Sequence, residues 1–143
     1  MSHEDIFDPS GLSALVLDGN HFQRGIAIDQ LRMLGFGRVL AAGDTAEAWD
    51  HVLKHNPDIV LIEWLEGPSD PLEFVRRLRT SEEAPNRAVS IFMLTTRGAA
   101  GNVETARRAG VDGYLRKPIS ALALHRRVKV VIANPQPFIV TAA

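Results

Sequence analysis

The sequence predicts an α/β fold, in which five parallel strands form one sheet with helices on both of its faces. Three observations support this prediction. Short apolar runs alternate with amphipathic stretches along the whole chain. Turn residues and helix-capping residues stand between them. A polar residue follows most of the apolar runs. This is expected for buried parallel strands, because ligands bind at the carboxyl ends of such strands.

The expected strands are short and mostly apolar. The first is the run LSALVL, which is followed by the turn signal Asp18-Gly19-Asn20. The third is wholly apolar and closes on Glu63. In chain order, the expected strands span residues 12–17, 38–42, 59–62, 90–94 and 114–115.

Capping residues mark the expected helices. Asp44 is followed three residues later by Glu47, which is a capping box. Pro71 occupies the first helical position after Asp70, and Gly110 closes the fourth helix. Five strand–helix units in this order predict a parallel sheet with right-handed crossovers. The expected helices span residues 22–34, 44–54, 70–80, 102–109 and 120–134.

Length and composition narrow the class of protein. The chain has 143 residues, enough for one domain that folds without a metal or a disulfide. It contains no cysteine, which excludes a disulfide scaffold, a thiolate metal site and a cysteine nucleophile. An apolar run long enough to cross a membrane and a signal peptide are both missing, so the cytoplasm is the expected compartment. We expect an N-terminal extension at 1–11, a domain at 12–134 and a C-terminal tail at 135–143.

Charge is distributed unevenly along the chain. Residues 1–86 carry 7 Lys and Arg against 15 Asp and Glu, a net charge of −8. Residues 87–143 carry 9 Lys and Arg against 2 Asp and Glu, a net charge of +7. Such an asymmetry of charge indicates which partners and ligands the chain can attract, and it does not indicate the fold.

Four polar residues follow the apolar strands: Asp18, Glu63, Thr95 and Lys117. In parallel sheets ligands bind at the carboxyl ends of the strands, so these side chains are expected at one mouth. Two carboxylates, a hydroxyl and an ammonium together suit a phosphoryl group or a divalent cation.

Several motifs extend this pattern: ALVLD before a helix, DIVLIEW, a strand that ends at Thr95, and AGVDGYLRKPIS. In this order and spacing the chain resembles a two-component receiver domain, the module of the chemotaxis response regulator. The resemblance covers residues 12–133. It implies a flavodoxin-like (βα)5 fold with a doubly wound, five-stranded parallel sheet in the strand order 2-1-3-4-5.

The resemblance also implies roles for individual residues. In the family, an Asp after the third strand takes a phosphoryl group, and two acids after the first strand hold Mg²⁺ with it. A hydroxyl and a Lys bind the phosphoryl oxygens, and an aromatic residue on the fifth strand reports the change. Asp18 matches the first acid, Thr95 the hydroxyl, Lys117 the Lys and Tyr114 the aromatic residue.

Two positions depart from the family pattern: Gly19 replaces the second acid, and Glu63 replaces the phosphoacceptor Asp. In addition, Thr96 stands where the family has a small residue after the hydroxyl. No cofactor is expected, because Asp18 and Glu63 would hold Mg²⁺ only weakly or not at all. The Glu63 carboxylate extends about 1.3–1.5 Å further than that of Asp, within reach of Lys117. Glu63 is then either a permanent stand-in for phospho-aspartate or one half of an inert ion pair.

The predicted function is that of an atypical single-domain response regulator, a pseudo-receiver that signals by phosphorylation-independent protein contacts. An enzyme is not expected, because the chain has no Walker loop, G-x-G-x-x-G or G-x-S-x-G motif. The alternative is a weakly phosphorylated, Mg²⁺-dependent receiver. The expected partner is a histidine kinase, a phosphotransferase or a downstream target, bound by a monomer or weak homodimer. Neither membrane nor nucleic acid is an expected partner.

By resemblance, a switch or partner face comprises the fourth and fifth helices and the fifth strand. It would include these residues: Arg107, Arg108, Tyr114, Arg116, Arg126 and Arg127. Its arginines suit an acidic protein or, as a further alternative, a cyclic dinucleotide bound by arginine forks. Tyr114 is either a rotamer switch or a packed tyrosine with a solvated hydroxyl. The apolar tail at 137–140 is expected to pack on the body or on a second chain.

Overall fold

The predicted sheet topology is confirmed in a computed structural model that describes residues 8–65, 67–133 and 139–141. The five expected strands are all parallel and lie in the order β2-β1-β3-β4-β5. Their bounds fall within a residue or two of the predicted ones. They are β1 (Ser13–Leu17), β2 (Arg38–Ala42), β3 (Ile59–Ile62), β4 (Ser90–Thr95) and β5 (Gly113–Arg116).

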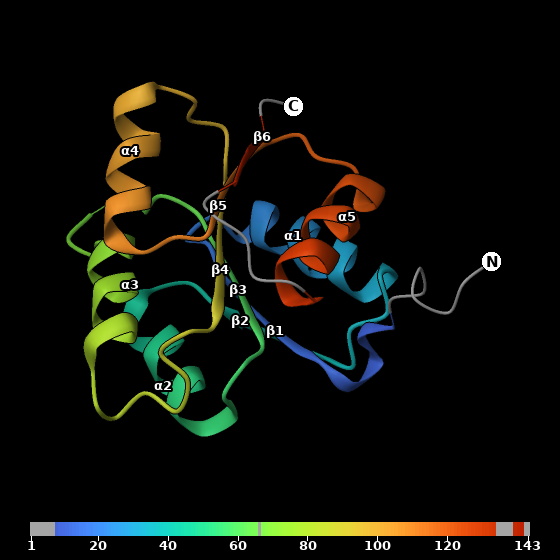
Figure 1. The fold of residues 1–143 in the computed structure, drawn as a ribbon, viewed down its shortest axis with the longest axis horizontal. Helices are drawn as coiled ribbons and strands as arrows, with labels where there is room; N and C mark the ends of the chain where they lie inside the picture. The colour runs from blue at the N-terminus through green and yellow to red at the C-terminus, as the bar shows by residue number, and fades with distance from the viewer. Residues whose placement is uncertain (1–7, 66, 134–138, 142–143) are drawn as a thin grey trace.

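Five helices cover the two faces of this sheet (Figure 1). They are α1 (His21–Met33), α2 (Thr45–His55), α3 (Pro71–Thr80), α4 (Ala100–Ala109) and α5 (Ala121–Ala133). In Figure 1, α2, α3 and α4 lie to the left of the sheet and α1 and α5 to the right. Each layer encloses its own apolar cluster against the sheet. Within the described residues, no helix combines the length and the apolar content needed to span a bilayer.

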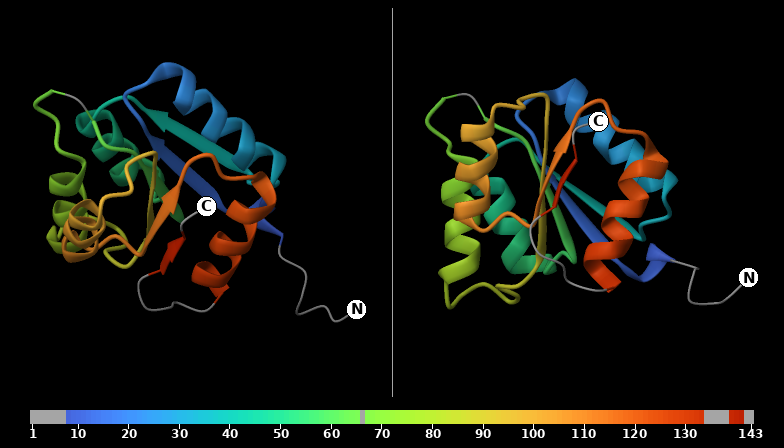
Figure 2. Two further views of the ribbon diagram at one scale, coloured as in Figure 1. Left: turned by 90° about the horizontal axis from the view of Figure 1, so that it is seen from above. Right: turned by 45° about the horizontal axis from the view of Figure 1, so that its top comes forward.

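The sheet has one strand more than the five that the sequence predicts. Strand β6 (Ile139–Thr141) pairs in parallel with β5, with Gly113 opposite Ile139 and Leu115 opposite Thr141. Figure 2 shows it at the edge of the sheet beside β5. The five-stranded expectation missed it because a three-residue strand is too short to show a periodicity in the sequence. Part of the C-terminal tail thus forms an edge strand against β5, as the expectation that the tail packs on a folded body required.

The helix caps agree with the sequence and orient the loops at the carboxyl edge of the sheet. The Asp44 carboxylate accepts the N–H of Glu47 at 2.8 Å, and the Glu47 carboxylate accepts the N–H of Gly43 at 3.0 Å. The predicted capping box therefore forms, although Glu47 reaches the residue before the cap rather than the cap itself. Asn20 caps α1 by accepting the N–H of Gln23 at 2.9 Å.

Residues before the first strand also pack against the domain. Pro9–Gly11 form a short 3-10 helix, and Pro9 is buried. The carbonyl of Ser10 lies so close to Gly37 that any Cβ at position 37 would collide with it. Glycine at 37 therefore permits the close approach of the N-terminal segment to the turn before β2.

Candidate functional site

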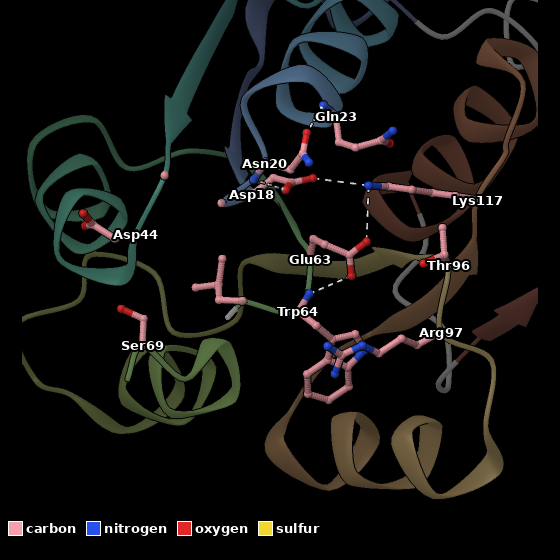
Figure 3. A pocket seen from close by; sticks show the side chains of 13 residues that line it. Asp18, Asn20, Gln23, Asp44, Glu63, Trp64, Ser69, Thr96, Arg97 and Lys117 are labelled. Atoms are coloured by element: carbon pink, nitrogen blue, oxygen red, sulfur yellow. Dashed lines mark hydrogen bonds and ion pairs between the residues drawn. The ribbon is translucent and has the colours of Figure 1, made fainter. Parts of the chain in front are cut away.

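A hollow of about 590 Å³ lies at the carboxyl end of the sheet (Figure 3). It is lined by residues from the loops that follow β1 to β5. Three of the four predicted strand-end residues, Asp18, Glu63 and Lys117, line it together. The prediction that these side chains converge is therefore confirmed for both carboxylates and the ammonium.

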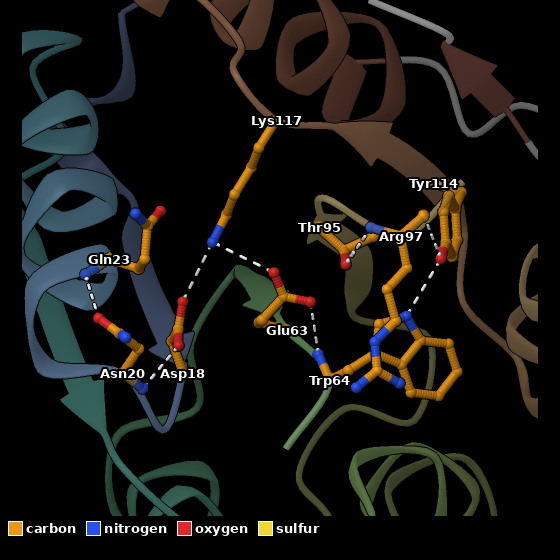
Figure 4. Close-up of polar contacts among 9 residues, drawn as sticks. All are labelled: Asp18, Asn20, Gln23, Glu63, Trp64, Thr95, Arg97, Tyr114 and Lys117. Atoms are coloured by element: carbon orange, nitrogen blue, oxygen red, sulfur yellow. Dashed lines mark hydrogen bonds and ion pairs between the residues drawn. The ribbon is translucent and has the colours of Figure 1, made fainter. Parts of the chain in front are cut away.

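Lys117 forms an ion pair with both carboxylates at once. Its Nζ lies 3.2 Å from Asp18 Oδ2 and 3.2 Å from Glu63 Oε2 (Figure 4). The exposed fractions of the Lys117, Asp18 and Glu63 side chains are 12%, 5% and 16%. Attraction between charges is stronger in this partly dry setting than at an open surface. The three side chains thus form one nearly buried triad.

The other groups of the two acids are also engaged. Asp18 Oδ1 accepts the N–H of Asn20 at 2.9 Å, and its carbonyl accepts Arg24 Nη1 at 2.8 Å. Glu63 Oε1 accepts the N–H of Trp64 at 2.7 Å. Each carboxylate is therefore held between a backbone N–H on one oxygen and Lys117 on the other.

The threonine that ends β4 and the one that follows it have different surroundings. Thr95 is fully buried, and its hydroxyl oxygen accepts the N–H of Arg97 at 3.1 Å. Its carbonyl accepts the N–H of Lys117 at 2.8 Å, which fixes the start of the loop after β5. Thr96, by contrast, is exposed and lines the hollow. Thr95, the residue matched to the family hydroxyl, thus has its hydroxyl engaged by the loop after β4.

Tyr114 is fully buried and its hydroxyl has two partners. The hydroxyl donates to the carbonyl of Arg97 at 2.8 Å and accepts Trp64 Nε1 at 3.1 Å. Of the two alternatives for Tyr114, the packed ring with a solvated hydroxyl is therefore wrong, because the loops after β3 and β4 close over the hydroxyl. Burial raises the pKa of Tyr114 above its ordinary value of 10.0.

Trp64 and Arg97 connect this tyrosine to the hollow, and Arg97 was not among the predicted site residues. The Arg97 guanidinium lies over the Trp64 ring, 5.4 Å from its centroid, and both residues line the hollow. Their positions in the sequence could have identified both as site residues, since Trp64 and Arg97 each come shortly after a strand that ends at the carboxyl edge of the sheet. Only the structure shows that they meet over Tyr114.

Gly19 supplies no ligand atom where the family has its second acid. A Cβ at this position would lie 3.3 Å from Leu65 Cδ2 and 3.7 Å from the carbonyl of Gly43. A larger side chain at 19 therefore needs Leu65 to move. Among the residues that the structure describes, no three His, Asp or Glu side chains are grouped as a metal site would require.

The arginines of α4 are engaged by an acid on the same helix. Glu104 Oε1 lies 2.6 Å from Arg107 Nη2 and 3.1 Å from Arg108 Nε. The hydrogen bond from Arg107 is the main cause that lowers the pKa of Glu104 to about 2. Arg107 and Arg108 are exposed and Glu104 is only partly covered, so these pairs contribute little to stability.

The remaining arginines of the predicted partner face lie elsewhere. Arg126 and Arg127 are exposed on α5, on the opposite face of the sheet from α4 (Figure 1). Arg116 packs on the loop before α4, where a Cβ at Gly98 would collide with its guanidinium. Strand β6 covers the edge of β5 between the two helices. The structure therefore divides these arginines and does not bring them to one site.

Comparison with known proteins agrees with this geometry. The sequence model of the response regulator receiver domain matches residues 14–129. Chemotaxis protein CheY1 of Helicobacter pylori is 31% identical over 125 residues, which are 86% of this chain and 98% of CheY1. The chemotaxis protein CheY homolog of Campylobacter jejuni is 33% identical over 124 residues, 86% of this chain and 94% of the homolog.

Solved structures show the same fold. The signal receiver domain of a modulated diguanylate cyclase from Desulfovibrio desulfuricans G20 has a TM-score of 0.75 and 25% identity, over 87% of this chain and 95% of that domain. CheY4 of Vibrio cholerae has a TM-score of 0.73 and 23% identity, over 84% of this chain and 98% of CheY4. Since the matched model covers most of the chain, and its relatives are similar over nearly their full length, this chain belongs to the CheY-like response regulator receiver domain family of two-component signalling.

Proposed function

We propose that this receiver domain signals through protein contacts without accepting a phosphoryl group, and that Glu63 replaces the phosphoacceptor Asp of the family. The observation that supports the proposal best is the triad at the mouth of the sheet. Lys117 contacts both Asp18 and Glu63 at 3.2 Å, so the ammonium offsets one of the two negative charges and already engages an oxygen of each acid.

Phosphoryl transfer depends mainly on positioning and electrostatics. The longer Glu63 side chain places its carboxylate about one C–C bond further into the hollow than an Asp would. It therefore stands where the oxygens of an incoming phosphoryl group would lie. Displacement of a reacting group by about 1 Å can cost on the order of 100-fold in rate.

The residues at the mouth do not fit a tightly bound Mg²⁺ ion. Mg²⁺ requires near-octahedral oxygen ligands and is usually bound through one or two carboxylates. Gly19 contributes no carboxylate, and the two acids that remain both contact the Lys117 ammonium. A dication between them would have to displace that ammonium, which already contacts both carboxylates. We therefore propose that the domain functions without a metal cofactor.

The proposed partners are signalling proteins. Receiver domains interact with histidine kinases and with downstream targets, and two relatives of this chain carry the name chemotaxis protein. Since exposed Arg126 and Arg127 leave α5 with a basic surface, an acidic partner surface is favoured there. We propose that the partner reads a fixed conformation of the domain.

Phosphorylation can be tested with acetyl phosphate and Mg²⁺ followed by intact-mass spectrometry. We expect no adduct on the wild-type chain. The matched control carries Glu63→Asp and Gly19→Asp, with Leu65→Ala to make room at position 19, and is expected to gain a labile adduct of one phosphoryl group. An Mg²⁺-dependent adduct on wild-type Glu63 would overturn the proposal.

The role of the Glu63 charge needs a separate experiment. A partner captured from the native cell extract is titrated against the wild-type chain, Glu63→Gln and Glu63→Asp. If Glu63 is a permanent stand-in for phospho-aspartate, Glu63→Gln weakens binding about tenfold or more, because it keeps the shape and removes the charge. Equal affinities for all three chains identify an inert ion pair instead.

A further inference from the structure

The C-terminal strand β6 occupies the edge of β5. Its three residues pair in parallel with Gly113, Tyr114 and Leu115. The edge of a sheet presents unpaired N–H and C=O groups, which readily accept a strand from the same or from another chain. The path of the chain from β5 through α5 to β6 therefore helps to decide whether β6 comes from the same chain or from a second copy.

The connection from β5 to β6 has the opposite hand to the others. The step from β1 to β2 runs toward one edge with α1 on one face, whereas the steps from β3 to β4 and from β4 to β5 run the other way with α3 and α4 on the opposite face. These crossovers share one hand. The step from β5 to β6 runs the same way as β4 to β5, but α5 lies on the face of α1. Parallel crossovers are right-handed in about 98% of cases, so a β5–α5–β6 connection within one chain is disfavoured.

The sequence between α5 and β6 also favours an extended connection. It reads Asn-Pro-Gln-Pro-Phe from residue 134 to residue 138. Proline fixes its own φ near −65° and pushes the residue before it toward extended conformations. Pro-rich segments are stiffer than Gly-rich ones, and short, stiff hinges favour exchange of the element that follows them.

We propose that two copies of this chain exchange β6, so that the strand of each copy pairs with β5 of the other. The exchanged dimer keeps the register in which Tyr114 lies opposite Val140 and removes the disfavoured crossover from both chains. Exchange of an identical element is a low-cost route to a dimer, because the same contacts form in both states. The helix that leads into the strand also carries exposed Leu122 and Val130, apolar surface that a second copy can cover.

Sedimentation velocity of the full chain at about 10 to 200 µM tests the proposal. We expect a dimer, and we expect a chain ending at residue 138 to be a monomer with unchanged far-UV circular dichroism. Val140→Pro, which retains the full length, is expected to weaken dimerisation as well. A wild-type chain that stays monomeric throughout, or a dimer that survives both changes, would overturn the proposal.

Cysteine cross-linking separates strand exchange from other dimers, because the natural chain has no cysteine. Leu115 and Thr141 lie opposite each other across β5 and β6. One chain carries Leu115→Cys, a second carries Thr141→Cys, and the two are co-expressed and oxidised. Strand exchange yields a covalent heterodimer, and each variant alone serves as the control. If the wild type is a dimer but no heterodimer cross-link forms beyond these controls, the strand is not exchanged.

Discussion

The two ends of the sheet each hold a partly buried cation, and the two cations differ in what surrounds them. At the carboxyl end, Lys117 contacts two carboxylates beside a hollow of about 590 Å³. At the amino end, Arg79 of α3 joins the start of β4 to the turn before β5. The side chains are similarly covered, with exposed fractions of 12% for Lys117 and 19% for Arg79.

Arg79 has backbone and side-chain partners in several directions. Its Nη1 donates to the carbonyls of Arg87 and Val89 at 2.7 and 2.6 Å. Its Nε and Nη2 both donate to the carbonyl of Gly110, and Nη2 also contacts Asp112 at 2.9 Å. All five N–H donors of the guanidinium can thus be used by the protein itself.

This difference distinguishes a structural ion pair from a functional one. The hydrogen bonds of Arg79 fasten three segments together and leave little for a ligand to bind. Lys117 and its two acids instead form the floor of a hollow that solvent or a partner can enter. We therefore expect substitutions at the amino end to change mainly stability, and substitutions at the carboxyl end to change mainly the response to ions and partners.

The largest loss of stability is expected for Arg79→Ala. The change leaves the Asp112 carboxylate and the carbonyls of Val89 and Gly110 without the guanidinium, at a cost of about 3 kcal/mol in the free energy of unfolding. Urea denaturation measures it. The matched control is Arg76→Ala on the same helix, which removes only an exposed pair with Glu73 and is expected to cost less than about 0.5 kcal/mol. Similar losses for the two variants would contradict the structural role of Arg79.

Lys117→Met should cost less, about 1–2 kcal/mol, because water and ions can reach Asp18 and Glu63 from the hollow. The variant should also gain a response to Mg²⁺ that the wild type lacks, since two acids without their ammonium attract a dication. Thermal unfolding with and without Mg²⁺ measures both effects. Lys54→Met, which removes an exposed pair with Asp50, is the control. An equal Mg²⁺ response of wild type and Lys117→Met would mean that Lys117 does not keep the ion out.

Tyr114→Phe is expected to cost about 1 kcal/mol, because the carbonyl of Arg97 and the indole N–H of Trp64 lose their common partner. Trp64→Phe removes only one of the two hydrogen bonds and should cost less. A double-mutant cycle with both changes isolates the coupling between the two rings. Zero coupling would show that Trp64 and Tyr114 do not act together in closing the loop over the tyrosine.

The same comparison shows what the sequence could reveal. The strands, the caps at Asp44 and Asp70, and the convergence of Asp18, Glu63 and Lys117 were predictable, because each depends on local patterns and on parallel topology. The contacts of Arg79 and Arg97 were not. The Arg79 guanidinium binds the carbonyls of Val89 and Gly110, and the Arg97 guanidinium lies over the ring of Trp64. These partners are distant in the sequence, and no spacing rule encodes them. The strand β6 was missed for a related reason, since three residues acquire a strand conformation only through the edge of β5.

The smallest expected effect is the change in the pKa of the buried Tyr114 when the charge of Glu63 at the hollow is removed. Tyr114 is the only tyrosine of the chain, so absorbance near 295 nm follows its ionisation directly. Burial raises its pKa first, and the negative charge of Glu63 raises it further. A raised pKa in the folded state means that the unfolded chain loses this proton first, so the stabilisation is complete below about pH 10 and is lost as the pH rises through the folded-state pKa.

Glu63→Gln removes the charge and should therefore lower the pKa of Tyr114, by less than burial raises it. Glu73→Gln, a change of an exposed acid paired with Arg76 on α3, is the matched control and should leave the titration unchanged. Trp64 donates a hydrogen bond to the Tyr114 hydroxyl, and this bond lowers the pKa of Tyr114. Trp64→Phe removes the bond and should therefore raise that pKa, in the opposite direction to Glu63→Gln. If Glu63→Gln and Glu73→Gln titrate alike, the tyrosine does not sense the charge at the mouth, and a partner that contacts the Tyr114 region would have no electrostatic link to Glu63.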